Sequence, residues 1–111
     1  MTVTARESAG EPYTLVVVAG EADITNRDDL RGVLDAEVTQ RPTTLILELS
    51  RLRFMDSSAL HVILQANRAL DRQGGVMALV APQEAVAKML KLTTADRLIP
   101  VFPSVAEATG G

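Results

Sequence analysis

The sequence predicts an α/β protein: a single layered domain with a small mixed, mostly parallel β-sheet of four or five strands and amphipathic helices packed on it. Short aliphatic runs alternate with segments whose apolar residues recur every three or four positions, which is typical of strand–helix–strand units with right-handed crossovers. Only 3% of the 111 residues are aromatic, so the core must consist of aliphatic side chains. We expect one domain over residues 1–111, with Gly110 and Gly111 frayed.

The first two expected strands form a hairpin. Residues 2–7 alternate weakly, and residues 13–19 are a strong apolar run that Gly20 ends. Gly10-Glu11-Pro12 is a turn signal between them, and the short connection favours antiparallel pairing. The first strand is therefore expected at an edge of the sheet.

A helix is expected after this hairpin. Thr25 and Asn26 are both common N-cap residues, and Pro42 stops the helix at its far end. Its buried face is expected to consist of aliphatic residues at helical spacing, which are Leu30, Val33, Leu34 and Val38.

Two further core strands enclose a second helix. Residues 44–49 are almost continuously apolar, as in a strand covered on both faces, and residues 76–80 form the next strand. Between them a helix opens at residue 56, runs to about residue 72 and ends at Gly74-Gly75. Its buried stripe is expected to contain Leu60, Ile63, Leu64 and Leu70.

The last third of the chain is expected to add one helix, one strand and a final turn. Ala81-Pro82 begins the helix, whose inward residues are Val86, Met89 and Leu90. Residues 98–102 form a short strand that Pro100 places at a sheet edge, and residues 105–109 add a helical turn.

Composition and charge exclude several classes of protein. The chain has no cysteine, so we expect no disulfide or thiolate metal site, and we assign no cofactor or metal. The net charge is −3 and the basic residues are scattered, which argues against nucleic-acid binding. The first ten residues show no signal-peptide pattern, and the longest apolar run is far too short to cross a membrane. We therefore expect a cytoplasmic protein without direct membrane insertion.

The most informative segment is ELSRLRFMDSSAL, residues 48–60. An apolar strand gives way to a charged stretch, and Asp56, Ser57 and Ser58 then stand at a helix start. Unpaired N–H groups and the positive end of the helix dipole stabilise a bound or covalent phosphate there. Serine and aspartate are also the preferred N-cap residues, so capping alone explains the pattern as well. The two roles are compatible, because one residue caps while its neighbour is modified.

A second polar segment, residues 20–23, follows the strand over residues 13–19. Loops at the carboxyl ends of adjacent parallel strands lie side by side. Asp23 is therefore expected near Ser57 and Ser58 as part of a small acidic pocket. The alternative is a simple glycine turn with Asp23 in solvent.

Several neighbours of the serines are candidates for binding a partner, and they are Glu21, Asp23, Met55, Leu60 and His61. Met55 and Leu60 either face a partner or pack in the core. His61 is the only histidine and lies one turn from Ser58, without the companions that a metal or catalytic role requires. A solvated helix residue is its simpler interpretation, and a partner contact is the alternative.

Three segments resemble the signature regions of the STAS-domain anti-sigma-factor antagonists. They are GEADITNRDDL (residues 20–30), LELSRLRFMDSSALHVIL (residues 47–64) and KLTTADRLIPVFPSVAEA (residues 91–108). The resemblance implies a STAS-like fold and a binding protein that is not an enzyme. In that family an anti-sigma factor with the histidine-kinase ATPase fold binds the unmodified antagonist. It phosphorylates the second small hydroxyl residue of an Asp-Ser-Ser/Thr-Gly motif and releases the product, and a serine phosphatase resets the switch.

The resemblance places the phosphoacceptor on Ser58, with switch-site neighbours Asp23, Asp56, Ser57 and Ala59. Two residues depart from the family pattern. Ala59 replaces the glycine after the acceptor, and Glu48 replaces an aspartate after the strand. Alanine suits a helix, but its methyl group is expected where a partner's backbone or nucleotide phosphates approach, which would affect the rate of phosphorylation more than its position.

Two other functions fit parts of the sequence. A STAS subunit associated with an ABC-type lipid transporter would share the fold as a non-switching structural partner, with the serine as a cap or contact. A small nucleotide hydrolase would need a phosphate-binding loop, a base paired with a nucleophile or a metal cluster, and the sequence offers none of these. The intact Asp-Ser-Ser motif together with Asp23 favours the phosphorylation switch.

Overall fold

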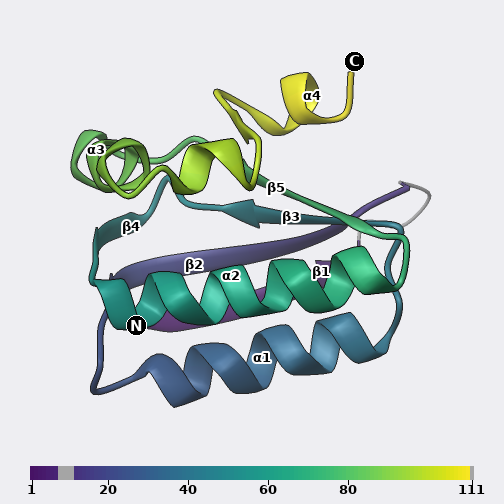
Figure 1. Ribbon diagram of the computed structural model, residues 1–111, viewed down its shortest axis with the longest axis horizontal. Coiled ribbons are helices and arrows are strands. Elements are labelled where there is room, and N and C mark those ends of the chain that lie inside the picture. The colour runs from purple at the N-terminus through teal and green to yellow at the C-terminus, as the bar shows by residue number, and fades with distance from the viewer. Residues whose placement is uncertain (8–11, 111) are drawn as a thin grey trace.

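A mixed β-sheet forms the centre of the protein, with helices on both of its faces (Figure 1). The computed structural model describes residues 1–7 and 12–110. In chain order its elements are β1 (Thr2–Glu7), β2 (Thr14–Ala22), α1 (Arg27–Thr39), β3 (Thr44–Glu48), β4 (Leu52–Met55), α2 (Ser57–Arg72), β5 (Val76–Val80), α3 (Glu84–Leu92), the 3-10 helix η1 (Ala95–Arg97), β6 (Val101–Phe102) and α4 (Val105–Ala108).

The strands lie in the order β1-β2-β3-β5-β6, and β4 pairs with the C-terminal end of β2, residues 20–22. β1 runs antiparallel to β2, and the other pairs are parallel. The predicted α/β class and the antiparallel hairpin are therefore confirmed. The expected turn at Gly10-Glu11-Pro12 lies largely outside the described residues, as does Gly111.

The two faces of the sheet are covered by different helices. α1 and α2 lie side by side against one face, and α3, η1 and α4 lie on the other (Figure 1). In the part of the chain that the structure describes, no helix is both long enough and apolar enough to cross a membrane.

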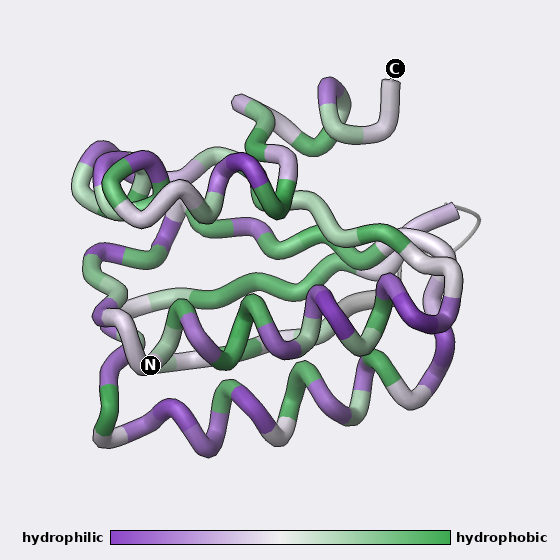
Figure 2. Tube along the Cα trace, viewed as in Figure 1, coloured by the Kyte–Doolittle hydropathy of each residue, from purple (hydrophilic) through white to green (hydrophobic). Residues whose placement is uncertain are grey.

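The main core lies between the sheet and the α1–α2 pair. Side chains alternate along a strand, so Val16 and Val18 of β2 belong to this core and are fully buried. The helices add aliphatic stripes, which are Leu30, Leu34 and Val38 of α1 and Leu60, Ile63 and Leu70 of α2. Figure 2 shows mainly apolar central strands and helices that alternate between apolar and polar positions. Val33, Leu64 and Met89, assigned to buried faces from their spacing, are half-buried. They pack against the cluster of buried residues, Met89 from α3 on the other face of the sheet.

β2 is longer than predicted, and β4 is a strand that the sequence did not reveal. Gly20 does not end β2, because its φ of 93° and its N–H bond to the Arg51 carbonyl at 2.9 Å carry the chain into a second pairing. Glu21 and Ala22 then pair with Phe54 and Met55 of β4. The described sheet consequently has six strands, one more than the largest number expected.

The last third of the chain also differs from prediction. The strand expected over residues 98–102 is shortened to Val101–Phe102, because η1 precedes it and Ile99 turns into the core with 0% exposure. Pro100 lies at the edge as predicted, and its carbonyl accepts the Leu79 N–H at 3.0 Å. α3 begins at Glu84 and not near Pro82, because Ala81 still donates its N–H to Phe102 at 2.9 Å.

Among the described glycines, Gly75 is the one where an added methyl group would meet the closest neighbours. A Cβ atom there would lie 2.7 Å from the Pro42 carbonyl oxygen and 2.8 Å from Leu70 Cδ1. Gly75→Ala should lower the free energy of unfolding by about 1–3 kcal/mol in urea titrations, because backbone must move to accept the methyl group. Gly32→Ala is the matched control: it meets nothing within 4 Å in α1 and should raise stability by about 1 kcal/mol. Equal effects of the two variants would contradict this account.

Candidate functional site: the start of helix α2

The chain passes directly from β4 into α2. Met55 ends the strand, Ser57 begins the helix, and Asp56 between them has extended φ and ψ of −93° and 177°. The parallel pairing of β4 with β2 sets Ala22 opposite Met55. The loop that follows Ala22 therefore lies beside the start of α2.

Asp56 joins these two segments with its side chain and its backbone. Its Oδ1 atom accepts the N–H of Ala59 at 3.0 Å, which caps α2. Its Oδ2 atom accepts the N–H of Ile24 at 3.0 Å, and its own N–H donates to the Ala22 carbonyl at 3.0 Å. Capping is therefore the role of Asp56, and the helix start does not depend on either serine hydroxyl for its cap.

Ser57 and Ser58 occupy the first turn of α2. Ser57 is exposed and Ser58 is half-buried, so neither is sealed in the core. Asp56 accepts the N–H of Ala59 with its carboxylate and that of Leu60 with its carbonyl, the latter at 3.1 Å. The N–H groups of the two serines have no carbonyl acceptor within the helix, because they lie in its first turn. They therefore add to the positive end of the helix dipole. An anion at this position is electrostatically favoured.

The loop between β2 and α1 is held by its own polar side chains. Asn26 accepts the Asp23 N–H with Oδ1 at 2.9 Å and donates from Nδ2 to the Glu21 carbonyl at 2.9 Å. Of the two candidate N-cap residues, Asn26 is the N-cap of α1, but its side chain makes no capping hydrogen bond and is bonded within the loop instead. Thr25 precedes the N-cap, and its hydroxyl donates to Asp23 Oδ1.

Asp23 carries a carboxylate stabilised in its charged form. The Thr25 hydroxyl lowers the pKa of Asp23 below its ordinary value of 3.8, and the N–H groups of Thr25 and Asn26 and the amino group of Met1 act in the same direction. Asp23 adjoins Ile24, whose N–H is bound by Asp56. The carboxylates of Asp23 and Asp56 therefore belong to adjoining segments, and each one accepts hydrogen bonds from N–H or O–H groups. Among the described residues, no group of three acidic or histidine side chains is placed to hold a metal ion.

The residues proposed as partner contacts divide into surface and core. Glu21 and His61 are exposed. Of the two alternatives for Met55 and Leu60, the structure supports packing in the core and not a partner contact, because each is only 4% exposed. Met55 lies opposite buried Ala22 in the β4–β2 pairing, and Leu60 lies on the core stripe of α2.

Both departures from the family pattern are accommodated within the fold. Ala59 has 0% exposure and belongs to the core cluster. The expectation that its methyl group meets a partner is therefore wrong. Glu48 Oε1 accepts the N–H of Ser50 at 2.6 Å, so its carboxylate serves the turn after β3.

Two exposed apolar residues of this region were missed by sequence reasoning. Ile24 is 61% exposed and Phe54 is 49% exposed. For Ile24 a signal exists, since it is an isolated aliphatic residue in an otherwise polar loop. Phe54 gives no such signal, because it lies beside Met55 within β4. Only the pairing of β4 with β2 decides which of its residues face inward and which face outward.

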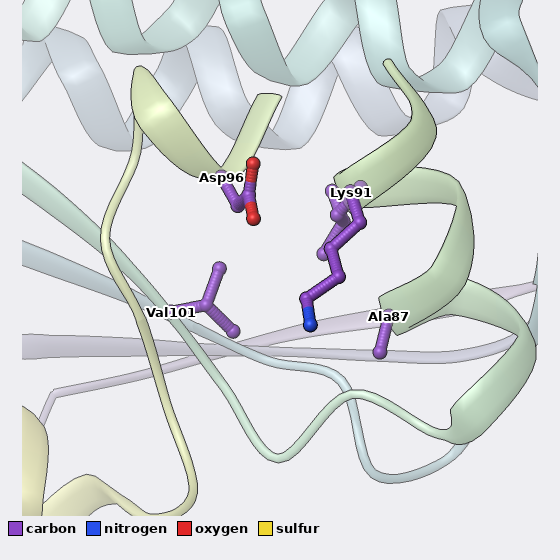
Figure 3. Close-up of a pocket in the computed structure, with 5 residues that line it drawn as sticks. Ala87, Lys91, Asp96 and Val101 are labelled. Carbon is purple, nitrogen blue, oxygen red and sulfur yellow. The ribbon is translucent and has the colours of Figure 1, made fainter. Parts of the chain in front are cut away.

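A hollow elsewhere in the molecule is lined by other residues. It has a volume of about 310 Å³ and lies among α3, η1 and β6, lined by Ala87, Leu90, Lys91, Asp96 and Val101. Figure 3 shows Lys91 reaching toward it from α3 and Asp96 facing it from η1. No residue from the start of α2 lines this hollow. The candidate site is therefore a separate surface, formed where β4 passes into α2.

Comparison with known proteins identifies the class. The STAS domain family matches residues 2–108, and the chain belongs to this family. It is 30% identical over 95 residues to the anti-sigma F factor antagonist of Paenibacillus polymyxa, covering 85% of this chain and 81% of the relative.

Solved structures agree with this assignment. The crystal structure of an anti-sigma factor antagonist from Mycobacterium paratuberculosis is 26% identical, with a TM-score of 0.88 over 98% of this chain and 91% of that one. The Bacillus cell fate determinant SpoIIAA in its phosphorylated form has a TM-score of 0.72 at 23% identity, over 98% of this chain and 97% of that one, and shows the shared fold. The predicted resemblance to STAS-domain anti-sigma factor antagonists is confirmed.

Loss of the Asp56 carboxylate should destabilise the protein. Asp56→Ala removes a helix cap and the bond to Ile24, with an expected loss of about 2 kcal/mol in the free energy of unfolding measured in urea. Asp56→Ser keeps a capping oxygen but cannot bridge both N–H groups, and should lose about half as much. Asp71→Ala, at an exposed position of α2, is the control and should change stability by less than about 0.5 kcal/mol. A loss in Asp56→Ala no larger than that of the control would contradict the bridging role.

The Thr25 hydroxyl should set the titration of Asp23. Because the folded-state pKa lies below 3.8, the interaction stabilises the fold above that pH and its contribution is lost as pH falls through the folded-state pKa. Thr25→Val should return the pKa of Asp23 toward 3.8, as measured by NMR titration of the side-chain carboxyl carbon. Thr39→Val removes a hydroxyl that bonds the Asp35 carbonyl in α1 and should leave the Asp23 titration unchanged. An Asp23 pKa at or above 3.8 in the unaltered protein would refute this assignment.

Proposed function

We propose that the protein is an anti-sigma factor antagonist that acts as one domain over residues 1–111. When unphosphorylated it binds an anti-sigma serine kinase of the histidine-kinase ATPase fold, and phosphate on Ser58 releases the kinase. A serine phosphatase then restores the hydroxyl. In this proposal the protein is cytoplasmic, needs no cofactor and is the substrate of the kinase without being an enzyme itself.

One observation carries the proposal: Ser58 keeps solvent access in the first turn of α2 while Asp56 provides the cap. A phosphate on Ser58 would therefore replace no structural hydrogen bond of the cap. The positive end of the helix dipole lowers the cost of the added charge. The named relatives support the class of protein, since the Paenibacillus polymyxa relative is an anti-sigma F factor antagonist.

The proposed transfer uses the chemistry of the kinase and the hydroxyl of this chain. Ser58 Oγ attacks the γ-phosphorus of kinase-bound ATP, and an O–P bond forms as the bond to the ADP oxygen breaks. ADP leaves, and the hydroxyl proton passes to a base of the kinase. The phosphatase later cleaves the ester with water, giving inorganic phosphate and the free hydroxyl.

Charge explains why the phosphorylated form would let go. The phosphate adds about −1.5 to −2 charges at neutral pH, at a position that would face the acidic or nucleotide-bearing surface of the kinase. A like charge brought into a contact costs several kcal/mol, and each 1.4 kcal/mol is a factor of about ten in Kd. Release of a micromolar partner therefore requires no change of fold.

Ser58 should be the residue that accepts phosphate. With the host's purified anti-sigma kinase and ATP, the intact mass of the protein should rise by one phosphate, and peptide mapping should place it on Ser58. Ser58→Ala should abolish incorporation, while Ser57→Ala, a matched hydroxyl one residue away in the same helix turn, should retain it.

The binding measurement completes this test. The unphosphorylated protein should bind the kinase, and the phosphorylated protein should bind at least about 100-fold more weakly, which corresponds to roughly 3 kcal/mol. Incorporation that survives in Ser58→Ala but is lost in Ser57→Ala would overturn the assignment of the acceptor. Constitutive association with a transporter ATPase, without any phosphorylation, would favour the non-switching STAS subunit instead.

A further inference from the structure

Two large apolar side chains stand exposed beside the start of α2. Ile24 lies in the loop after β2 with 61% exposure, and Phe54 lies in β4 with 49% exposure. We propose that these two residues are the apolar anchors by which the anti-sigma kinase docks on the protein. This inference rests on the proposed function and adds the contacts that supply its affinity.

The exposure of Phe54 results from an irregularity in the β4–β2 pairing. Gly20 pairs with Leu52, but Glu21 pairs with Phe54, so Arg53 is an extra residue in β4. In a regular strand Leu52 and Phe54 would face the same side. The extra residue reverses this relation, and Leu52 is fully buried while Phe54 is turned outward.

Ile24 is held in place by the bonds of its loop. Its N–H is bound by Asp56 Oδ2 at 3.0 Å, and Asp23 on its N-terminal side is fixed by Asn26 Oδ1 at 2.9 Å. A side chain on a backbone that is already ordered loses less conformational entropy when it is covered by a partner. Both anchors are therefore presented by constrained backbone segments.

The two anchors belong to the two segments that adjoin the first turn of α2: Phe54 to β4 and Ile24 to the loop after β2. The end of β4, the first turn of α2 and the loop that leads into α1 meet at one end of the molecule (Figure 1). Ile24 approaches this end from the α1 side, through its bond to Asp56. Phe54 approaches it from the sheet, opposite Glu21 of β2.

An interface centred on Ser58 reaches both residues. Phosphoryl transfer requires the γ-phosphorus to come within about 3–3.5 Å of the serine oxygen. A standard interface covers about 800 Å² on each partner, which corresponds to a radius of roughly 16 Å. Phe54 is four residues from Ser58, so their Cα atoms are at most about 14 Å apart. Ile24 is bonded to Asp56, which is two residues from Ser58.

The expected partner surface has a defined chemistry. It offers two apolar depressions beside the nucleotide site that faces Ser58. Polar residues surround the anchors, with Glu21, Arg51 and Arg53 exposed around Phe54. An apolar centre with a polar rim is the usual organisation of a protein interface, and buried aromatic side chains often supply most of its binding energy.

The test compares these anchors with equally exposed apolar residues elsewhere. Phe54→Ala and Ile24→Ala should each raise the Kd of the unphosphorylated protein for the host's purified anti-sigma kinase by about tenfold or more, measured by calorimetry. Initial rates of Ser58 phosphorylation should show a raised KM with unchanged kcat. Phe54→Leu should retain most of the affinity. Thermal unfolding should show that all three variants remain folded at the assay temperature, because about half or more of each altered side chain is exposed.

Two exposed apolar residues at the N-terminal end of the parallel strands serve as matched controls. Val76, which begins β5, is 58% exposed, and Leu98, which precedes β6, is 63% exposed. Val76→Ala and Leu98→Ala should change Kd by less than about twofold. Weakening equal to that of the anchor variants would overturn the proposal.

Failure of this inference can be distinguished from failure of the proposed function. If both anchor variants bind the kinase like the unaltered protein while phosphate on Ser58 still releases it, the anchors are wrong and the switch stands. If none of the host's purified anti-sigma kinases binds the protein or phosphorylates Ser58, the switch itself is refuted, and the anchors with it.

Discussion

The arrangement of the site depends on one carboxylate. Asp56 accepts the N–H of Ala59 with one oxygen and the N–H of Ile24 with the other, both at 3.0 Å. The same side chain therefore caps α2 and ties the β2–α1 loop to it. Hydrogen bonds to a charged group are stronger than bonds between neutral groups. Without this bridge, the two segments would still be joined by the backbone bond from Asp56 to Ala22, the pairing of β2 with β4 and the packing of α1 on α2.

Because the cap is provided by Asp56, the serines of the first turn of α2 are left to a different task. In the proposed mechanism the added phosphate changes the charge of a surface whose backbone is already ordered. Release would then follow from charge repulsion and from the free-energy cost of removing water from the phosphate in the contact, without refolding. The same bonds order Ile24 and the end of β4, so the proposed anchors and the proposed switch share one scaffold.

Much of the fold and of the site follows from local patterns in the sequence. The apolar periodicities over residues 44–49 and 56–72 correspond to β3 and α2. The position of Asp56 ahead of two serines, followed by apolar residues at helical spacing, indicates a helix start. The burial of Met55, Leu60 and Ala59 does not follow in the same way. Their burial depends on which side of β4 and of α2 faces the core. Because adjacent residues point in different directions, a shift of one residue would exchange buried and exposed positions.

The sequence by itself determined the α/β class, the antiparallel start of the sheet and the residues that open α2, because periodicity, turn chemistry and capping act over a few residues. Only the tertiary structure decided that β2 continues past Gly20, that β4 exists and that Phe54 faces outward. It also decided that Asp56 reaches Ile24, 32 residues away along the chain. These features are set by the register between distant segments, and that register emerges only when the segments pack together.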